Sequence, residues 1–218
     1  MRIAVYGLWH LGCVTAACLA AAGHRVVGLD MNADTVASLR EGRLPLHEPG
    51  LDELTAGALA SGQLRFTAEP GEALRDSDVL WEPPVDDHDQ ADVASVRDAL
   101  ERVASAIRPG TLVLISSQVP VGFTGALQRD WAGRGLGFAY SPENLRLGRA
   151  IESFRQPERV VIGVDAGADE ARARLHALFA RFCERLEWMS VASAEMTKHA
   201  VNAFLATSVA FVNEGARI

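Results

Sequence analysis

Short apolar runs alternate along this chain with longer stretches of helical periodicity, and this alternation narrows the range of folds more than any other feature. The candidate strands are Arg2–Tyr6, Arg25–Leu29, Leu64–Thr67, Val79–Trp81, Leu112–Ser116, Gly137–Tyr140 and Arg159–Val164. The candidate helices between them are Leu11–Ala22, Ala33–Glu41, Leu51–Ser61, Glu72–Asp76, Val93–Ala106, Thr124–Ala132 and Asp169–Arg181. The early strands are almost continuously apolar, as expected for strands covered on both faces. The pattern predicts an α/β fold with a doubly wound parallel sheet.

The last 26 residues, Ser193 to Ile218, differ from the rest because they form one long helical pattern without a proline. Ser193, with Glu195 two positions later, is a reasonable signal for the start of this helix. Apolar side chains nearly surround it, so we expect other elements to cover most of its sides.

The composition is typical of a folded domain in a reducing compartment. The chain has 218 residues, of which 49% are hydrophobic, enough for one large domain or for a domain with an appendage. Its net charge of −7 means that no excess of basic residues is available to neutralise the phosphate backbone of a nucleic acid, so we expect no nucleic-acid partner. Three cysteines form no disulfide framework.

The N-terminus lacks the features of a signal peptide and no apolar run reaches about 18 residues, so we expect a cytoplasmic protein without a membrane span.

A glycine-containing turn follows the first strand. The chain passes from Tyr6 through Gly7-Leu8-Trp9-His10-Leu11-Gly12 into a helix, and the next strand ends on Asp30. A strand, a tight turn, a helix N-terminus and an acid after the second strand are the setting of a dinucleotide-binding turn. The helix N-terminus attracts a pyrophosphate, and an acid accepts hydrogen bonds from ribose hydroxyls and repels a 2′-phosphate. We therefore predict NAD as the cofactor in a Rossmann-like fold, with these cofactor-binding residues in the turn: Gly7, Trp9, His10, Leu11, Gly12 and Asp30.

Trp9 stands where this turn has its second glycine, a residue that lets the backbone approach the pyrophosphate. Two interpretations are open. The turn binds NAD with the indole lying against the cofactor, or the glycines serve only the turn and the packing of the helix.

Several segments, in order along nearly the whole chain, resemble the UDP-glucose/GDP-mannose dehydrogenase family. They are VYGLWHLG, VVGLD, EGRLPLHEPGLDEL, PVDDHDQADV, SSQVPVGFT, SPENLRLGRAIESFRQPERVVIG and AEMTKHAVNAFLATSVAFVNEGARI. The resemblance implies an NAD-dependent oxidation of a nucleotide sugar at C6, from alcohol to carboxylate. It also implies an NAD-binding domain at residues 1–190 and the start of a central dimerisation helix at 191–218, hence a homodimer.

In that family a second domain carries much of the nucleotide-sugar site and a nucleophilic cysteine, and we expect it to be absent from this chain. None of the three cysteines matches the nucleophile. We predict that each of them, Cys13, Cys18 and Cys183, is a buried thiol.

The resemblance also assigns catalytic residues. Lys198 and Asn202 are four residues apart on one helix face and match the pair that stabilises negative charge on the reacting oxygen. Glu143 matches the base that activates water for hydrolysis of the thioester. The plainer alternatives are a solvated helix face for the first two residues and a cap or dipole partner for Glu143.

Further residues complete the predicted sites. The segment 144–148 matches a loop that holds the nucleotide sugar through its backbone, so the substrate-binding residues are Glu143, Asn144, Leu145, Leu147, Lys198 and Asn202. Leu147 stands where many members have a second glutamate. The other predicted cofactor-binding residues are Pro83, Ser117 and Gln118, and two of them depart from the family pattern: Pro83 replaces a threonine and Gln118 replaces another. His47 and His88 belong to no recognised ligand set, so we predict no metal.

The sequence therefore predicts the NAD-binding portion of a nucleotide-sugar 6-dehydrogenase, of the UDP-glucose type, from a divergent branch. One alternative is a non-catalytic nucleotide-binding or assembly module derived from the same family. Another is a different NAD enzyme, such as a hydroxyacid dehydrogenase, which shares the turn and Asp30 but leaves SPENLRLG and HEPGLDEL unexplained.

Overall fold

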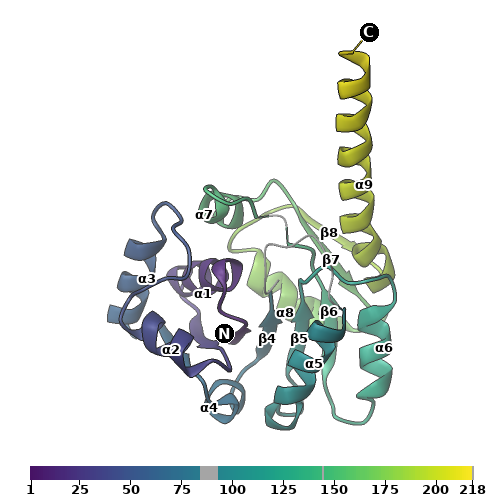
Figure 1. The fold of residues 1–218 in the computed structure, drawn as a ribbon. Helices are drawn as coiled ribbons and strands as arrows, with labels where there is room; N and C mark the ends of the chain where they lie inside the picture. The colour runs from purple at the N-terminus through teal and green to yellow at the C-terminus, as the bar shows by residue number, and fades with distance from the viewer. Residues whose placement is uncertain (84–92, 144, 218) are drawn as a thin grey trace.

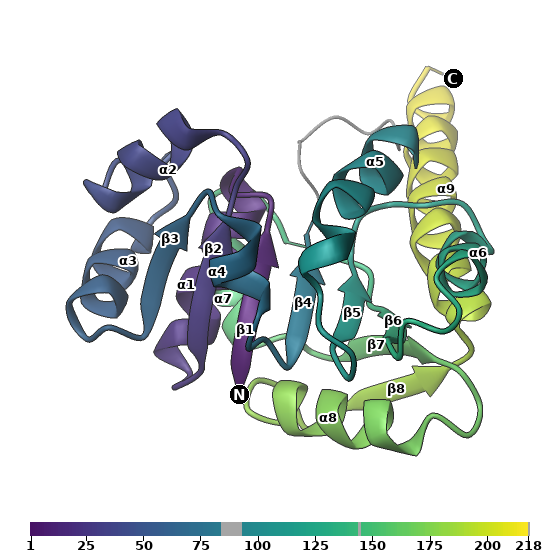
Figure 2. The same cartoon turned by 90° about the horizontal axis from the view of Figure 1, so that it is seen from below.

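The computed structural model describes residues 1–83, 93–143 and 145–217 and contains one eight-stranded sheet with helices on both faces (Figures 1 and 2). The strands are β1 (Arg2–Tyr6), β2 (Arg25–Leu29), β3 (Leu64–Thr67), β4 (Val79–Glu82), β5 (Leu112–Ile115), β6 (Gly137–Tyr140), β7 (Val160–Val164) and β8 (Leu186–Met189). The helices are α1 (His10–Ala21), α2 (Ala33–Arg40), α3 (Leu51–Ala60), α4 (Pro70–Leu74), α5 (Val93–Val103), η1 (Ala104–Ala106), α6 (Phe123–Asp130), α7 (Ala150–Arg155), α8 (Asp169–Phe179) and α9 (Val191–Gly215).

The strand order is β3-β2-β1-β4-β5-β6-β7-β8, with neighbours parallel from β3 to β6. The chain winds outward from β1 in one direction to β3 and then from β4 in the other. This confirms the predicted doubly wound α/β fold. The order reverses between β1 and β4, and in such sheets ligands bind in the crevice outside the carboxyl ends of the strands at that point.

Two apolar clusters hold the layers together. One face of the sheet packs on α1, α2, α3, α7 and α8, and the other on α4, α5, α6 and the first turns of α9. The inner strands are buried on both faces, which is why their sequences are continuously apolar.

β7 is antiparallel to β6, whereas the sequence predicted a wholly parallel sheet. After Tyr140 the chain forms a loop and the short helix α7 and then re-enters the sheet from the edge at which β6 ended. β8 is parallel to β7. Neither β8 nor α7 was predicted from the sequence.

The long helix α9 begins at Val191, and its N-cap is Ser190, whose side chain accepts a hydrogen bond from the Ser193 N–H at 3.2 Å. The expected start at Ser193 is therefore wrong. The first turns pack on the sheet through Val191 and Ala194, and Gly163 of β7 gives them room, because a Cβ there would lie 2.6 Å from the Ala194 side chain. The remainder leaves the body of the molecule (Figure 1). Within the described residues no helix, α9 included, is long and apolar enough to cross a membrane.

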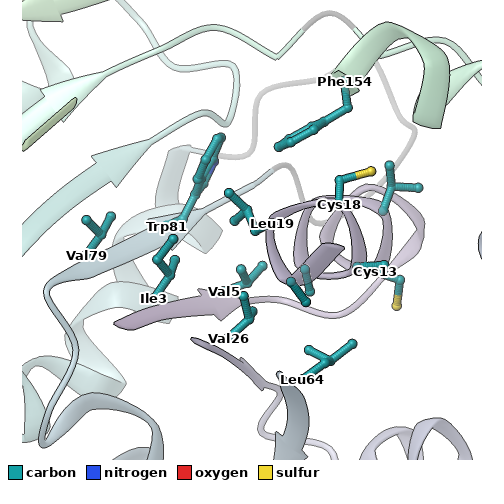
Figure 3. Close-up of a cluster of buried hydrophobic side chains, with 14 of the residues drawn as sticks. Ile3, Val5, Cys13, Cys18, Leu19, Val26, Leu64, Val79, Trp81 and Phe154 are labelled. Atoms are coloured by element: carbon teal, nitrogen blue, oxygen red, sulfur yellow. The ribbon is translucent and has the colours of Figure 1, made fainter. Parts of the chain in front are cut away.

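The three cysteines are buried, and Figure 3 shows two of them, Cys13 and Cys18, in the core. Cys13 and Cys18 are on α1 among Val5, Leu19 and Phe154, and burial raises the pKa of each thiol to about 12. Cys183 is buried as well. The neutral thiols of Cys13 and Cys18 are poor nucleophiles, and the burial of all three cysteines agrees with the predicted role as packing residues.

Candidate nucleotide-binding and catalytic site

The turn after β1 requires both of its glycines. Gly7 has a φ of +106°, in the region that side chains disfavour. A Cβ on Gly12 would lie 1.8 Å from the carbonyl oxygen of Gly7, so the first turn of α1 packs directly on the turn backbone. The chain therefore places the N-terminus of α1 next to the carboxyl ends of β1 and β4.

Asp30 faces this turn from the end of β2. Its Oδ2 accepts a hydrogen bond from the Leu8 N–H at 2.9 Å, and its Oδ1 accepts one from the Asn32 N–H at 2.9 Å. These two bonds fix the carboxylate beside the turn, the position predicted for a ribose-binding acid.

Trp9 is the N-cap residue of α1, with a φ of −80° that any residue adopts without strain, so glycine is not needed there for the backbone. Its side chain is 40% exposed and lines a hollow with residues of α2 and with Leu44 and Pro45. The first hydrogen bond of the helix runs from the Cys13 N–H to the Trp9 carbonyl. The N–H groups of the preceding turn, at His10, Leu11 and Gly12, are thus those that an α-helix leaves without a partner inside it.

The side chain of His10 turns inward, away from this helix end. It is 1% exposed, and its Nε2 lies 2.9 Å from Oε2 of the equally buried Glu48. The backbone N–H of His10, and not its ring, is therefore the group available to a ligand at the turn.

Pro83, Ser117 and Gln118 follow the carboxyl ends of β4 and β5. Pro83 is buried against Gly12. The Ser117 hydroxyl donates a hydrogen bond of 2.6 Å to Oε1 of Glu82, the last residue of β4. Burial raises the pKa of Glu82 to about 7, although the hydroxyl and N–H of Ser117 act in the opposite direction.

Helix α9 brings the predicted catalytic residues to the same edge. The Lys198 Nζ donates a 2.8 Å hydrogen bond to the backbone carbonyl of Glu143, and the Asn202 amide donates one of 3.3 Å to Oε1 of Gln118. Between them, His199 Nε2 lies 2.8 Å from the carbonyl oxygen of Val119. The plainer interpretation of Lys198 and Asn202, a solvated helix face, is not what the structure shows, because both contact loops at the carboxyl edge of the sheet.

A hollow of about 360 Å³ adjoins this group. Glu143, Leu145, Thr197 and Val201 line it together with aromatic side chains of the core. Leu147 is 61% exposed on the loop that follows, and Asn144, also predicted to bind substrate, lies outside the described residues.

Three buried carboxylates, Glu48, Glu82 and Glu195, make contacts that were not predicted from the sequence. Glu82 had a usable signal, an acid at the end of an apolar strand beside the predicted cofactor site. Glu48 lies in the segment HEPGLDEL, whose only signal in the sequence is its resemblance to the family. Among the described residues no group of three or more His, Cys, Asp or Glu side chains could hold a metal ion.

A glycine turn at a helix N-terminus, an acid at the end of the second strand beside it and a topological switch point define a dinucleotide-binding domain of the doubly wound class. Residues 1–183 match the family model "UDP-glucose/GDP-mannose dehydrogenase family, NAD binding domain", and the chain belongs to this family.

Individual relatives support this assignment to the family. A UDP-glucose 6-dehydrogenase of Pseudomonas aeruginosa is 36% identical over 98% of this chain and 50% of its own length. The crystal structure of a ternary complex of GDP-mannose dehydrogenase from the same species has a TM-score of 0.86 at 28% identity, covering 98% of this chain and 52% of that one. A UDP-glucose dehydrogenase from Pyrobaculum islandicum has a TM-score of 0.83 at 36% identity, covering 97% and 51%. The chain spans about half the length of the curated relatives it matches.

Proposed function

We propose that this chain is the NAD-binding portion of a nucleotide-sugar 6-dehydrogenase of the UDP-glucose type, which oxidises the C6 alcohol of the sugar to a carboxylate in the cytoplasm. The observation that carries the proposal is the meeting of Gln118, Glu143, Lys198 and Asn202 at the carboxyl edge of the sheet. These residues come from three separate segments, and the same edge carries the glycine turn.

The residues at the turn fit NAD. The N–H groups of the first turn of α1 suit a pyrophosphate, because a helix N-terminus attracts anions. Asp30 suits the ribose hydroxyls and disfavours the 2′-phosphate of NADP. Gly7 and Gly12 pack closely and carry no side chains, so a dinucleotide bound at the turn would contact the backbone directly. Bound NAD supplies the acceptor for the hydride.

Lys198 and Asn202 supply hydrogen-bond donors where negative charge develops on oxygen. Loss of hydride from an alcohol carbon requires loss of the hydroxyl proton, and preorganised donors lower the cost of that charge. The contact with the Glu143 carbonyl holds the ammonium of Lys198 at the edge of the sheet. Glu143 is our candidate for the base that activates water in the hydrolytic step. The thiol nucleophile of such a reaction is none of Cys13, Cys18 and Cys183, which are buried.

Asp30→Ala is expected to weaken NAD binding at least about tenfold, because a carboxylate that holds two ribose hydroxyls contributes two charge-assisted hydrogen bonds. Titration calorimetry with NAD on the wild type and the variant measures this. Asp169→Ala, in the first turn of α8, removes the same charge from an exposed position that does not line the hollow beside Trp9, and is the control. Absence of NAD binding by the wild-type chain at millimolar cofactor contradicts the proposal. Binding by the wild type with unchanged affinity in Asp30→Ala contradicts the role of Asp30.

We further propose that a second copy of this chain covers α9. The helix exposes large apolar side chains beyond the body of the molecule, among them Phe204 at 76% and Phe211 at 80%. Unpartnered apolar surface of this extent marks an association site. The double variant Phe204→Ser/Phe211→Ser is expected to convert a dimer into a monomer in sedimentation equilibrium, with Thr207→Ser on the same helix as the control. A wild-type chain that is monomeric at tens of micromolar refutes the dimer.

A further inference from the structure

The segment HEPGLDEL, which the proposed chemistry does not use, contains a carboxylate that joins three distant parts of the chain. Oε2 of Glu48 accepts a hydrogen bond from the Gly148 N–H at 2.8 Å and lies 2.9 Å from His10 Nε2. Its Oε1 accepts one from the Ala150 N–H at 2.8 Å. His10 belongs to the first turn of α1, and Gly148 and Ala150 belong to the loop before α7 and to the start of α7. One side chain therefore ties the phosphate-binding helix to the loop that contains the predicted substrate-binding residues.

The geometry of the loop makes these bonds specific. The Arg149 N–H donates to the Arg146 carbonyl at 2.9 Å, forming a turn in which Gly148 has a φ of +83°. The turn directs the N–H groups of Gly148 and Ala150 at the same carboxylate. Burial alone raises the pKa of Glu48, and the two N–H groups with the His10 ring more than offset this, so its pKa lies below the usual value. The loop is thus held by an ionised carboxylate in the interior.

We propose that Glu48 is the positioning residue of the loop at 145–149, holding the loop backbone in the conformation that binds the nucleotide sugar. The inference rests on the proposed function for the identity of the ligand. Leu145 lines the hollow beside Glu143, and the anchors at Gly148 and Ala150 fix the far end of the same short loop. Glu48 acts through this backbone and does not touch the reacting atoms.

Glu48→Gln tests the proposal with almost no change in shape. A glutamine has one acceptor oxygen, so whichever way its amide is turned, an NH₂ group faces the N–H of Gly148 or of Ala150. The histidine contact can persist, because the His10 ring can change tautomer. The expected result is hydrogen exchange about tenfold faster or more at whichever of the Gly148 and Ala150 amides faces the new NH₂ group, with exchange in β1 and β4 unchanged. Glu53→Gln makes the same chemical change on an exposed position of the same segment and is expected to leave the loop as in the wild type.

Calorimetry with UDP-glucose and with NAD supplies the functional readout. In Glu48→Gln the dissociation constant for UDP-glucose is expected to rise about tenfold or more, while that for NAD changes by less than about threefold. Unchanged exchange at Gly148 and Ala150, or equal losses of UDP-glucose and NAD affinity, overturns the proposal, as does faster exchange spread over the whole sheet. If the wild-type chain binds NAD but no UDP-glucose, the exchange at the two amides decides the role of Glu48 by itself, because in the family a second domain carries much of the nucleotide-sugar site.

Discussion

At pH 8, Glu82→Gln is expected to raise the free energy of unfolding by about 3 kcal/mol. The carboxyl is 1% exposed, and its pKa rises from 4.5 to about 7 on folding, chiefly through burial. Between these two values the folded state binds more protons than the unfolded state, so stability falls as pH rises from about 4.5 to 7 and stays low above. A shift of this size corresponds to about 3 kcal/mol. The glutamine amide is neutral and keeps an acceptor for the Ser117 hydroxyl. Its NH₂ group faces the Ser117 N–H, but that bond is already long at 3.4 Å in the wild type, so little is lost there.

Urea unfolding of both proteins at pH 5 and pH 8 measures the effect, and the pH itself is the control. At pH 5 the folded wild type holds the proton, so the gain from the substitution is expected to shrink to about 1 kcal/mol. A gain that is the same at both pH values, or a loss at pH 8, contradicts a destabilising charge at Glu82.

Glu195→Gln is expected to have the opposite sign, a loss of about 2–3 kcal/mol at pH 7. Glu195 of α9 is completely buried, and its two carboxylate oxygens accept the N–H groups of Gly122 at 2.5 Å and Thr124 at 2.8 Å. It thereby caps the N-terminus of α6. Glutamine must turn an NH₂ group toward one of these donors, which leaves a buried N–H without an acceptor.

The control for this loss is Glu214→Gln, at the exposed end of the same helix, where the carboxylate pairs with Arg217 across a solvent-exposed face. Such a surface pair contributes little, so its removal is expected to change stability by less than about 0.5 kcal/mol. Equal effects of the two substitutions in urea unfolding contradict the capping role of Glu195.

Much of the fold could be predicted because apolar runs determine which strands lie at the centre of a sheet. Val79–Glu82 and Leu112–Ile115 are buried throughout and were recognised. β8 was missed because Leu186–Met189 is only half-buried at the edge of the sheet, and its sequence, LEWM, has no apolar run. α7 was missed because six residues are too few to show a helical period.

The candidate site could be predicted in part. Short-range patterns located Gly7, Gly12 and Asp30, since turn, helix and strand follow each other directly in the sequence. The buried carboxylates could not be paired, because the donors to Glu48 lie 100 and 102 residues away and those to Glu195 lie 73 and 71 residues away. Glu195 also misled the prediction of the helix start, because an acid near Ser193 looks like a partner of its own helix N-terminus.

The first two turns of α9 lie along β6 and β7, so that Lys198 emerges at the carboxyl edge of the sheet. A helix advances about 1.5 Å and turns about 100° with each residue. Inserting or deleting a single residue between Ser190 and Lys198 would therefore rotate Lys198 and Asn202 away from their loops, and it would rotate Phe204 and Phe211 by the same angle. The helix thus couples the orientation of the two hydrogen-bond donors to the orientation of the apolar surface, and no one-residue insertion or deletion in this segment can rotate one of them without rotating the other.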